Sequence, residues 1–167
     1  MDISADKIKE LRQKTGAGVM DCKKALTDAA GDFNKACDML TERGLDIAKK
    51  KSERTAEQGL IECYVHTGNH LGVMLEINCE TDFVARTQDF KDLAHNIALQ
   101  ISAMSPLYVS KDNIPEGDTA DPAAVCLLQQ PYIKDPSKTI QDIITETIAK
   151  TGENIKIRRF VRFELGY

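Results

Sequence analysis

The chain has 167 residues, a length that suits one medium domain or two small ones and allows about 70% of the unfolded surface to be buried. Its 26 acidic and 22 basic residues give a formal net charge of −4, which argues against a protein that mainly coats phosphate backbones. Five cysteines without a C-x-x-C pair indicate reduced thiols in a cytosolic protein. Because no stretch approaches about 20 apolar residues and the start lacks a signal-peptide pattern, we expect no membrane association.

Residues 1–54 are predicted to form a bundle of three short helices. Ser4 is a suitable cap for the first helix, and Gly16 stands where a left-handed residue would end it. A second helix runs to a break at Gly31, and a third begins at Asp32 and is expected to end at Gly44. Apolar residues recur at helical spacing and predict a shared core of Ala5, Ile8, Leu11, Cys22, Ala25, Leu26, Ala29, Phe33, Ala36, Cys37 and Leu40.

The charged run Lys49–Arg54 marks the predicted boundary between a domain of residues 1–54 and a second of residues 55–167. Its basic residues are able to contact nucleic acid, but a solvated linker is the simpler interpretation. The apolar period then changes from helical to two, since Ile61, Cys63 and Val65 alternate with polar or larger residues. A second alternating run, Val73–Cys79, follows a tight turn at Gly68-Asn69, so these segments predict a β-hairpin.

Two strands are marginal alone, so the sheet needs a further strand and a helical cover. The alternating segment Ile155–Leu165 supplies the strand. A helix beginning near Thr87 supplies the cover, and its apolar stripe is Phe90, Leu93, Ala94, Ile97, Ala98 and Ile101. The predicted class is therefore α+β, a three-helix bundle followed by a small antiparallel β-sheet core covered by helices.

The connection Ser105–Pro136 contains all five prolines and is expected to be mostly extended, with one helical turn near Ala123–Leu128. A last helix is predicted from Ser137, with Gly152 ending it.

Residue patterns typical of enzymes are scarce. His66 and His70 have H-x-x-x-H spacing, but they flank a hairpin turn and not a helix, so the pattern does not favour a metal site. No phosphate-binding loop, nucleophile elbow or local cysteine and histidine pair is present. We therefore expect no metal, no cofactor and no enzyme activity, while a metal or thiol enzyme built on these histidines remains one alternative.

Phe83 is the residue that the apolar periodicities leave unexplained. It lies beyond the end of the alternating strand residues, and it is out of phase with the apolar stripe of the helix that starts at Phe90. Either Phe83 folds back into the core beside a capping Asp82, or the pair points outward toward a partner. Val19 and Met20 at the start of the second helix pose the same choice, because the pattern alone fits a contact surface or a core.

Four segments closely resemble the elongation factor Ts family, the guanine-nucleotide exchange factors of elongation factor Tu. They are "LRQKTGAGVMDCKKAL" (Leu11–Leu26), "NCETDFVAR" (Asn78–Arg86), "GENIKIRRF" (Gly152–Phe160) and "RFELG" (Arg162–Gly166). The resemblance runs in order from one end of the chain to the other and leaves the connection Ser105–Pro136 unmatched. The resemblance implies an N-terminal domain similar to ubiquitin-associated domains, followed by an α+β core. It also implies a cytoplasmic translation factor that is not an enzyme and whose partner is Tu, without direct contact with nucleic acid.

The resemblance implies two sets of site residues. Thr81, Asp82, Phe83 and Val84 correspond to the family segment that intrudes near the magnesium and nucleotide site of Tu. Leu11, Val19 and Met20 correspond to the helix face through which the N-terminal domain docks on Tu. No magnesium or other metal is implied on this chain itself.

Longer members of the family carry two related core halves, and this chain has room for one. We therefore expect a homodimer formed through the sheet face that the helices leave open, which the alternation predicts to include Tyr64, Met74 and Phe160. A ribosome-associated or RNA-binding accessory protein remains a second alternative, although the acidic balance disfavours it.

Overall fold

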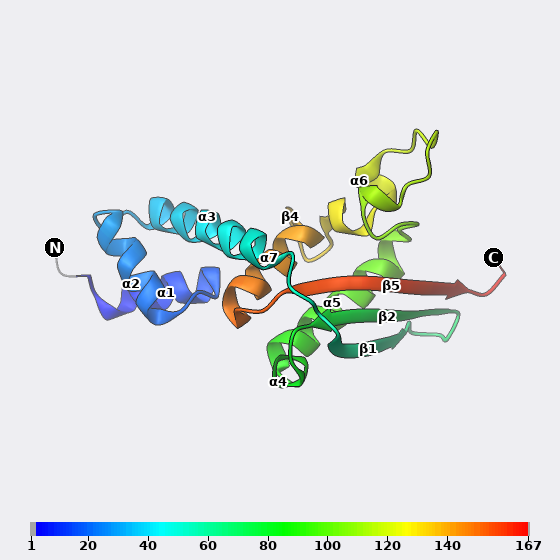
Figure 1. The fold of residues 1–167 in the computed structure, drawn as a ribbon, viewed down its shortest axis with the longest axis horizontal. Helices are drawn as coiled ribbons and strands as arrows, with labels where there is room; N and C mark the ends of the chain where they lie inside the picture. The colour runs from blue at the N-terminus through cyan, green and yellow to red at the C-terminus, as the bar shows by residue number, and fades with distance from the viewer. Residues whose placement is uncertain (1–2, 167) are drawn as a thin grey trace. The chain divides into compact units, whose positions relative to one another are not determined.

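The structure, a computed structural model, describes residues 3–166. The chain divides into two compact units, one of Met1–Glu53 with Thr145–Glu153 and the other of Arg54–Ile144 with Asn154–Tyr167. Helices and a small antiparallel sheet make up the fold (Figure 1), which confirms the predicted α+β class. Within the described range, no helix is both long enough and apolar enough to cross a membrane.

The first unit contains α1 (Ala5–Thr15), α2 (Val19–Asp28) and α3 (Phe33–Lys51). The predicted caps are confirmed. The Ser4 side chain accepts a hydrogen bond from the backbone N–H of Lys7 at 3.3 Å, and Gly16 ends α1 in the left-handed region. The side chain of Asp32 caps α3 in the same way as Ser4 caps α1. The buried core of the bundle is Leu11, Cys22, Ala25, Leu26, Ala29 and Ala36.

The sequence predicts that the third helix ends at Gly44, but α3 continues beyond this residue to Lys51. Gly44 is buried inside α3, and a Cβ built on it would lie 3.5 Å from the Cβ of Ala149. One glycine costs a helix interior only about 1 kcal/mol relative to alanine, which does not end a helix whose apolar stripe continues. Here the stripe does continue, because Ile47 and Ala48 are half-buried one turn later.

The sheet of the second unit consists of β1 (Gln58–Val65), β2 (Leu71–Cys79) and β5 (Ile155–Glu164) in the order β1-β2-β5, with antiparallel neighbours. The predicted hairpin turn between β1 and β2 is confirmed, since Gly68 and Asn69 both have positive φ. α5 (Gln88–Met104) covers one face of the sheet, and all six residues of its predicted stripe are buried (Figure 1).

The side chains of β1 lie on the opposite faces of the sheet from those predicted, since Tyr64 was expected on the face that the helices leave open. Tyr64 lies on the face that α5 covers, where its ring meets that of His95 edge-on with the centroids 5.8 Å apart. The pairing register explains this orientation, because it places Tyr64 opposite Val73, whose side chain is buried. Consequently Ile61 and Val65 are exposed on the other face, which we call the uncovered face.

A β-bulge corrects the assignment of the last strand. Ile157 pairs with Ile77 and Arg159 pairs with Glu76, so Arg158 is an extra residue between the two pairs. The phase of the strand therefore changes, and Phe160 lies half-buried on the covered side, not on the uncovered face as predicted. After the bulge the exposed apolar residues of β5 are Val161 and Phe163.

The connection after α5 is more structured than its prolines suggested. It contains η1 (Lys111–Asn113), α6 (Pro122–Val125), η2 (Leu127–Gln129), β3 (Pro131–Tyr132) and β4 (Asp135–Thr139).

The last helix, α7 (Ile140–Thr151), begins three residues later than predicted. The Asp135 carboxylate accepts from the backbone N–H and the hydroxyl of Ser137, which holds these residues in a turn, and the Thr139 hydroxyl then caps α7 by accepting from the N–H of Asp142. Gly152, at φ 73°, follows the end of the helix as expected.

Candidate functional site

The segment between β2 and α5 folds into a single helical turn, α4 (Asp82–Ala85). Thr81 has extended backbone angles, and its hydroxyl accepts from the N–H of Val84 at 3.4 Å, so Thr81 is the N-cap of this turn. The buried thiol of Cys79 donates to the carbonyl oxygen of Thr81 at 3.1 Å. The last residue of the central strand, Cys79, thus holds the N-cap residue of the turn.

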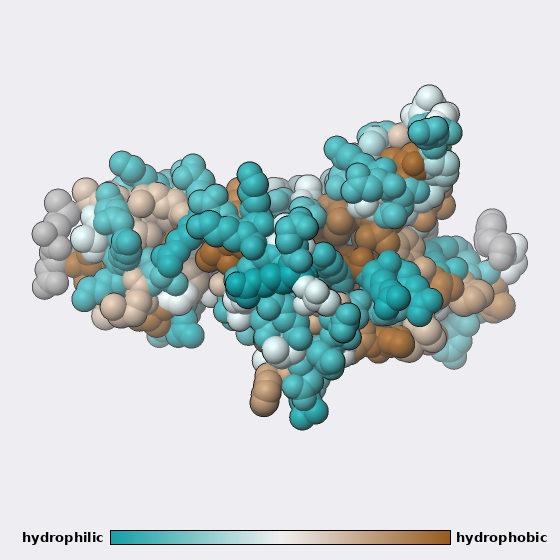
Figure 2. Space-filling view, viewed as in Figure 1, coloured by the Kyte–Doolittle hydropathy of each residue, from teal (hydrophilic) through white to brown (hydrophobic). Residues whose placement is uncertain are grey.

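Phe83 projects from this turn into solvent and is 79% exposed. Ala85, two residues later, is buried, and Val84 is half-buried, so the turn has an inner side and an outer side. Where Figure 1 labels α4, Figure 2 shows an apolar projection among hydrophilic atoms. An aromatic ring held outward in this way has most of its apolar area available for a contact with a partner.

Asp82 lies at the first position of α4, next to Phe83. Its carboxylate forms an ion pair with the guanidinium of Arg86, with 2.9 Å between Oδ2 and Nη2, and both side chains are substantially exposed. An exposed i,i+4 pair of this kind contributes less than about 1 kcal/mol. Its effect is to orient the carboxylate, which offers oxygen atoms of the type that magnesium prefers. The carboxylate of Asp82 and the ring of Phe83 are therefore presented to solvent from adjacent positions of the turn.

Glu80 connects the segment between β2 and α5 to two other parts of the same unit, at Asn154 and Arg54. One oxygen of its carboxylate accepts from the backbone N–H of Asn154 at 2.7 Å, and the other lies 3.4 Å from Nη1 of Arg54. The buried side chain of Asn154 in turn donates to the carbonyl oxygen of Arg54 at 2.7 Å. The sequence patterns gave no role to Glu80, Arg86 or Asn154. All three lie inside segments that resemble the family, but the contact between Glu80 and Asn154 joins positions far apart in the chain, which sequence spacing does not reveal.

The three predicted docking residues of the N-terminal bundle do not share one surface. Val19 and Met20, in the first turn of α2, are 49% and 73% exposed. Leu11, by contrast, is completely buried in the core of the bundle, so its side chain cannot belong to a contact surface and instead supports α2 from beneath. The apolar surface available there is therefore Val19 and Met20.

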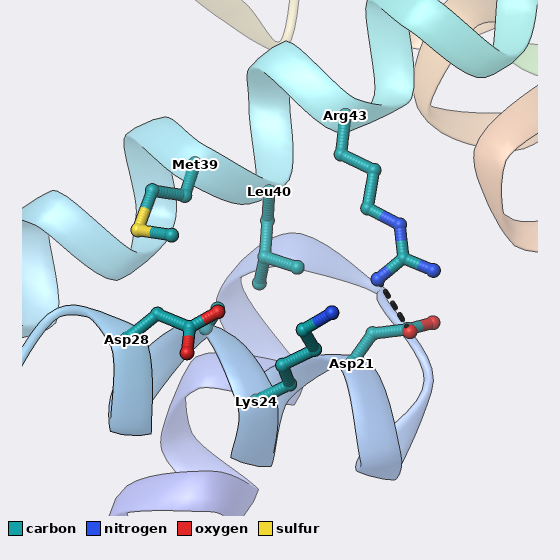
Figure 3. Close-up of a pocket in the computed structure, with 7 residues that line it drawn as sticks. Asp21, Lys24, Asp28, Met39, Leu40 and Arg43 are labelled. Carbon is teal, nitrogen blue, oxygen red and sulfur yellow. Dashed lines mark ion pairs between the residues drawn. The ribbon is translucent and has the colours of Figure 1, made fainter.

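A groove of about 210 Å³ lies between α2 and α3. Figure 3 shows Asp21 and Arg43 pointing toward one another at one end, where their ion pair measures 2.7 Å. The rest of the lining carries both signs of charge around a small apolar floor and consists of Lys24, Ala25, Asp28, Met39 and Leu40. Asp21 follows Met20 directly, so the groove borders the exposed start of α2.

The histidines do not form a metal site in this structure. Nδ1 of His66 lies 2.9 Å from the hydroxyl of Tyr64, and Nδ1 of His95 lies 2.9 Å from Oε1 of Glu62. Across residues 3–166, no group of three or more His, Cys, Asp or Glu side chains is arranged to hold a metal ion. Burial raises the pKa of the Cys22 and Cys126 thiols above the ordinary value, which disfavours the reactive thiolate at both positions.

The fold and the two exposed apolar turns have the features of a protein that acts by contacting another protein. The family model described as "Elongation factor TS" matches residues 6–122 and 120–167 of the chain. The match includes the connection Ser105–Pro136, for which the sequence motifs gave no resemblance. The chain therefore belongs to the elongation factor Ts family. Membership implies a translation elongation factor that promotes nucleotide exchange on elongation factor Tu.

Individual relatives support the same assignment over nearly the whole chain. Elongation factor Ts of Thermoanaerobacter sp. (strain X514) is 47% identical over 194 positions, which cover 98% of this chain and 95% of the relative. The proteins of the same name from Moorella thermoacetica and Herpetosiphon aurantiacus are 44% and 46% identical, with 98% and 99% of this chain covered and 96% and 99% of the relatives. Because these alignments are longer than the chain, the relatives carry residues without a counterpart here. The family model matches this chain in two segments that overlap at residues 120–122.

Proposed function

We propose that this chain binds elongation factor Tu in its GDP form, disturbs the magnesium and nucleotide site of Tu with the turn at α4, and thereby promotes GDP release so that GTP can bind. The observation that carries the proposal is the exposure of Phe83, an aromatic ring held outward beside a carboxylate on an anchored turn. The proposal is also supported by the resemblance of Thr81 to Val84 to the family segment that is expected to reach the magnesium and nucleotide site of Tu.

The physical basis is that binding of the exchange factor and binding of the nucleotide oppose each other. A G protein holds GDP largely through Mg²⁺ and a phosphate-binding loop, so a partner that favours a displaced metal site lowers nucleotide affinity by the same factor as GDP lowers the partner's affinity. Burying Phe83 in an apolar pocket of Tu supplies about 1.5–3 kcal/mol toward that state. The Asp82 carboxylate adds a negative charge, which repels nucleotide phosphates and attracts the metal.

No covalent step takes place on this chain in the proposed mechanism, so it is an exchange factor and not an enzyme. The N-terminal bundle contributes affinity through Val19 and Met20, while the turn at α4 contributes the displacement. Exchange takes place in the cytoplasm, and the chain needs neither a cofactor nor nucleic acid of its own.

The direct test is the release of a fluorescently labelled GDP from purified elongation factor Tu. An exchange factor is released after each event, so an amount of this protein well below that of Tu should discharge all the Tu present. Release only in proportion to the amount added, or no acceleration, would contradict the proposal. Bound zinc in the purified protein would instead favour the alternative of a metal enzyme, and tight RNA binding with a steep salt dependence would favour the RNA-binding alternative.

We further propose that the uncovered face of the sheet is a homodimer interface. The exposed apolar residues of this face come from all three strands and are Ile61, Val65, Met74, Val161 and Phe163. Phe163 is 72% exposed. An apolar sheet face open to water on this scale is typical of a self-association site.

Light scattering tests the dimer. We expect twice the 18.5 kDa mass of the chain at micromolar concentration and a shift to the single mass in Phe163→Asp. The single mass for the unmutated protein would refute the dimer without affecting the exchange proposal.

A further inference from the structure

The turn that carries Phe83 is too short to hold its own shape. α4 has four residues, and a first helical turn is unfavourable by itself because it fixes several backbone dihedrals for one hydrogen bond. Phe83 makes little contact with the rest of the chain, since most of its surface is exposed. The orientation of the ring therefore depends on what holds the two ends of the turn.

The hydroxyl groups of two threonines hold these ends. At the start, the hydroxyl of Thr81 accepts from the N–H of Val84 over a long distance of 3.4 Å. At the end, the hydroxyl of Thr87 donates to the carbonyl oxygen of the same residue, Val84, at 2.7 Å, which is the ideal distance for such a bond. The backbone N–H of Thr87 donates to this carbonyl as well, at 3.0 Å. The hydroxyl hydrogen bond at the Thr87 end is thus the shorter of the two.

Thr87 is also the first anchor of α5. Its hydroxyl accepts from the N–H of Phe90 at 3.3 Å and so caps that helix. α5 is fixed to the sheet by its buried stripe, which begins at Phe90 itself. One hydroxyl group therefore donates to the turn that carries Phe83 and accepts from the helix that is packed in the core.

We infer that Thr87 is a positioning residue for the exchange reaction: its hydroxyl couples the turn that presents Phe83 to the rigid helix α5. This inference rests on the proposed function of Phe83. Without the hydroxyl, the turn samples other conformations, and only a fraction of encounters with Tu finds the ring in place. Thr87 itself needs no contact with Tu.

The matched pair of variants is Thr87→Val, which keeps the shape and removes the hydroxyl, and Thr87→Ser, which keeps the hydroxyl. We expect Thr87→Val to lower the rate of GDP release at saturating protein about 3- to 10-fold with KM for Tu changed less than about twofold, because the docking surface on α2 is intact. Thr87→Ser should remain within about twofold of the unmutated rate. An equal loss in both variants would overturn the inference.

A double-mutant cycle separates positioning from a general loss of stability. In a Phe83→Ala background, Thr87→Val should cause no further loss of exchange, because there is no longer a ring to position. A further loss of the same size would show that Thr87 acts independently of Phe83 and would overturn the inference. Thr139→Val serves as the control, since the Thr139 hydroxyl caps α7 with a similar pair of hydrogen bonds. It should lower Tm by a comparable amount, about 2–4 °C, without slowing exchange.

Amide hydrogen exchange provides a measurement that does not involve Tu. The N–H groups of Ala85 and Arg86 donate within the turn at 3.3 and 3.2 Å, and their protection should fall at least about fivefold in Thr87→Val while that of Ile97 in α5 is unchanged. Unchanged protection at Ala85 and Arg86 would overturn the inference whatever the activity. An unmutated protein that does not accelerate GDP release would instead overturn the proposed function, and the amide measurement would still show whether Thr87 holds the turn.

Discussion

Replacing Phe83 by alanine is expected to remove most of the exchange activity and to leave the fold nearly as stable. The ring is 79% exposed, so only about a fifth of the 1.5–3 kcal/mol available from full burial is gained on folding, or about 0.3–0.6 kcal/mol. For a chain of this length that loss lowers Tm by about 1–2 °C. A buried phenylalanine, by comparison, costs about 3–5 kcal/mol when truncated.

The effect on exchange follows from the surface that the free protein leaves exposed. If the remaining four-fifths of the ring is buried only when Tu is engaged with a displaced metal site, alanine removes about 1.2–2.4 kcal/mol from that state. The rate of GDP release should then fall about 10- to 50-fold.

Two measurements on the same preparation decide the matter: thermal unfolding, and release of labelled GDP from Tu with substoichiometric protein. Leu107→Ala is a suitable control, because Leu107 is also a largely exposed apolar residue and lies outside the proposed contact sites. Its activity and melting temperature should both remain close to those of the unmutated protein. A large fall in the melting temperature of Phe83→Ala would show that the ring is part of the core, and unchanged exchange would show that the ring is not used.

Three further predictions concern other parts of the chain. Met20→Asp should raise KM for Tu about tenfold and leave the saturated rate within about twofold, because it alters docking alone; a fall in the saturated rate with unchanged KM would contradict this. Gly44→Ala should raise Tm by about 2–4 °C, since the helix gains propensity and the added methyl meets Ala149 at an ordinary distance, whereas a lower Tm would mean that the site is overpacked. The hydrogen bond from Arg159 lowers the pKa of Glu76 below its ordinary 4.5, so the stability it contributes is present above that pH and is lost as pH falls through the lowered pKa. Glu76→Gln should therefore lower Tm at about pH 7, and the difference should shrink as the pH is lowered below 4.5, whereas a difference that stays the same in acid would refute the assignment.

Local signals in the sequence were sufficient for several helix ends and for the hairpin turn. Capping depends only on residues within one turn of a helix end, so it can be predicted from the local sequence. The structure confirms the caps at Ser4, Gly16 and Asp32. Gly44 was misjudged for the complementary reason. A glycine ends a helix only when no packing contact stabilises the helix beyond it. Here Gly44 packs against Ala149, which lies far along the chain and is therefore not visible to local sequence signals.

The faces of the sheet were harder to predict because β1 carries residues able to be buried on both sides. Alternation shows which residues share a face but not which face is covered, and the choice was made by the register with β2, which places Tyr64 opposite the buried Val73. In the same way, sequence periodicity singled out Phe83 as unexplained, but the hydrogen bonds of Thr81 and Thr87 that hold its turn depend on backbone geometry that periodicity does not contain.

The bulge at Arg158 takes up one residue of β5, so the strand depends on the number of its residues as well as on their identity. Side chains alternate between the two faces, so one residue inserted after Arg159 would turn Phe160 toward water and bring Phe163 to the side of α5, whereas deleting Arg158 would remove the bulge and leave both faces unchanged. After such an insertion, every later residue of β5 would keep its identity and face the opposite side of the sheet. Length changes between relatives are therefore expected to accumulate near residues 120–122, where the two segments of the family match overlap, and to avoid the regular part of β5.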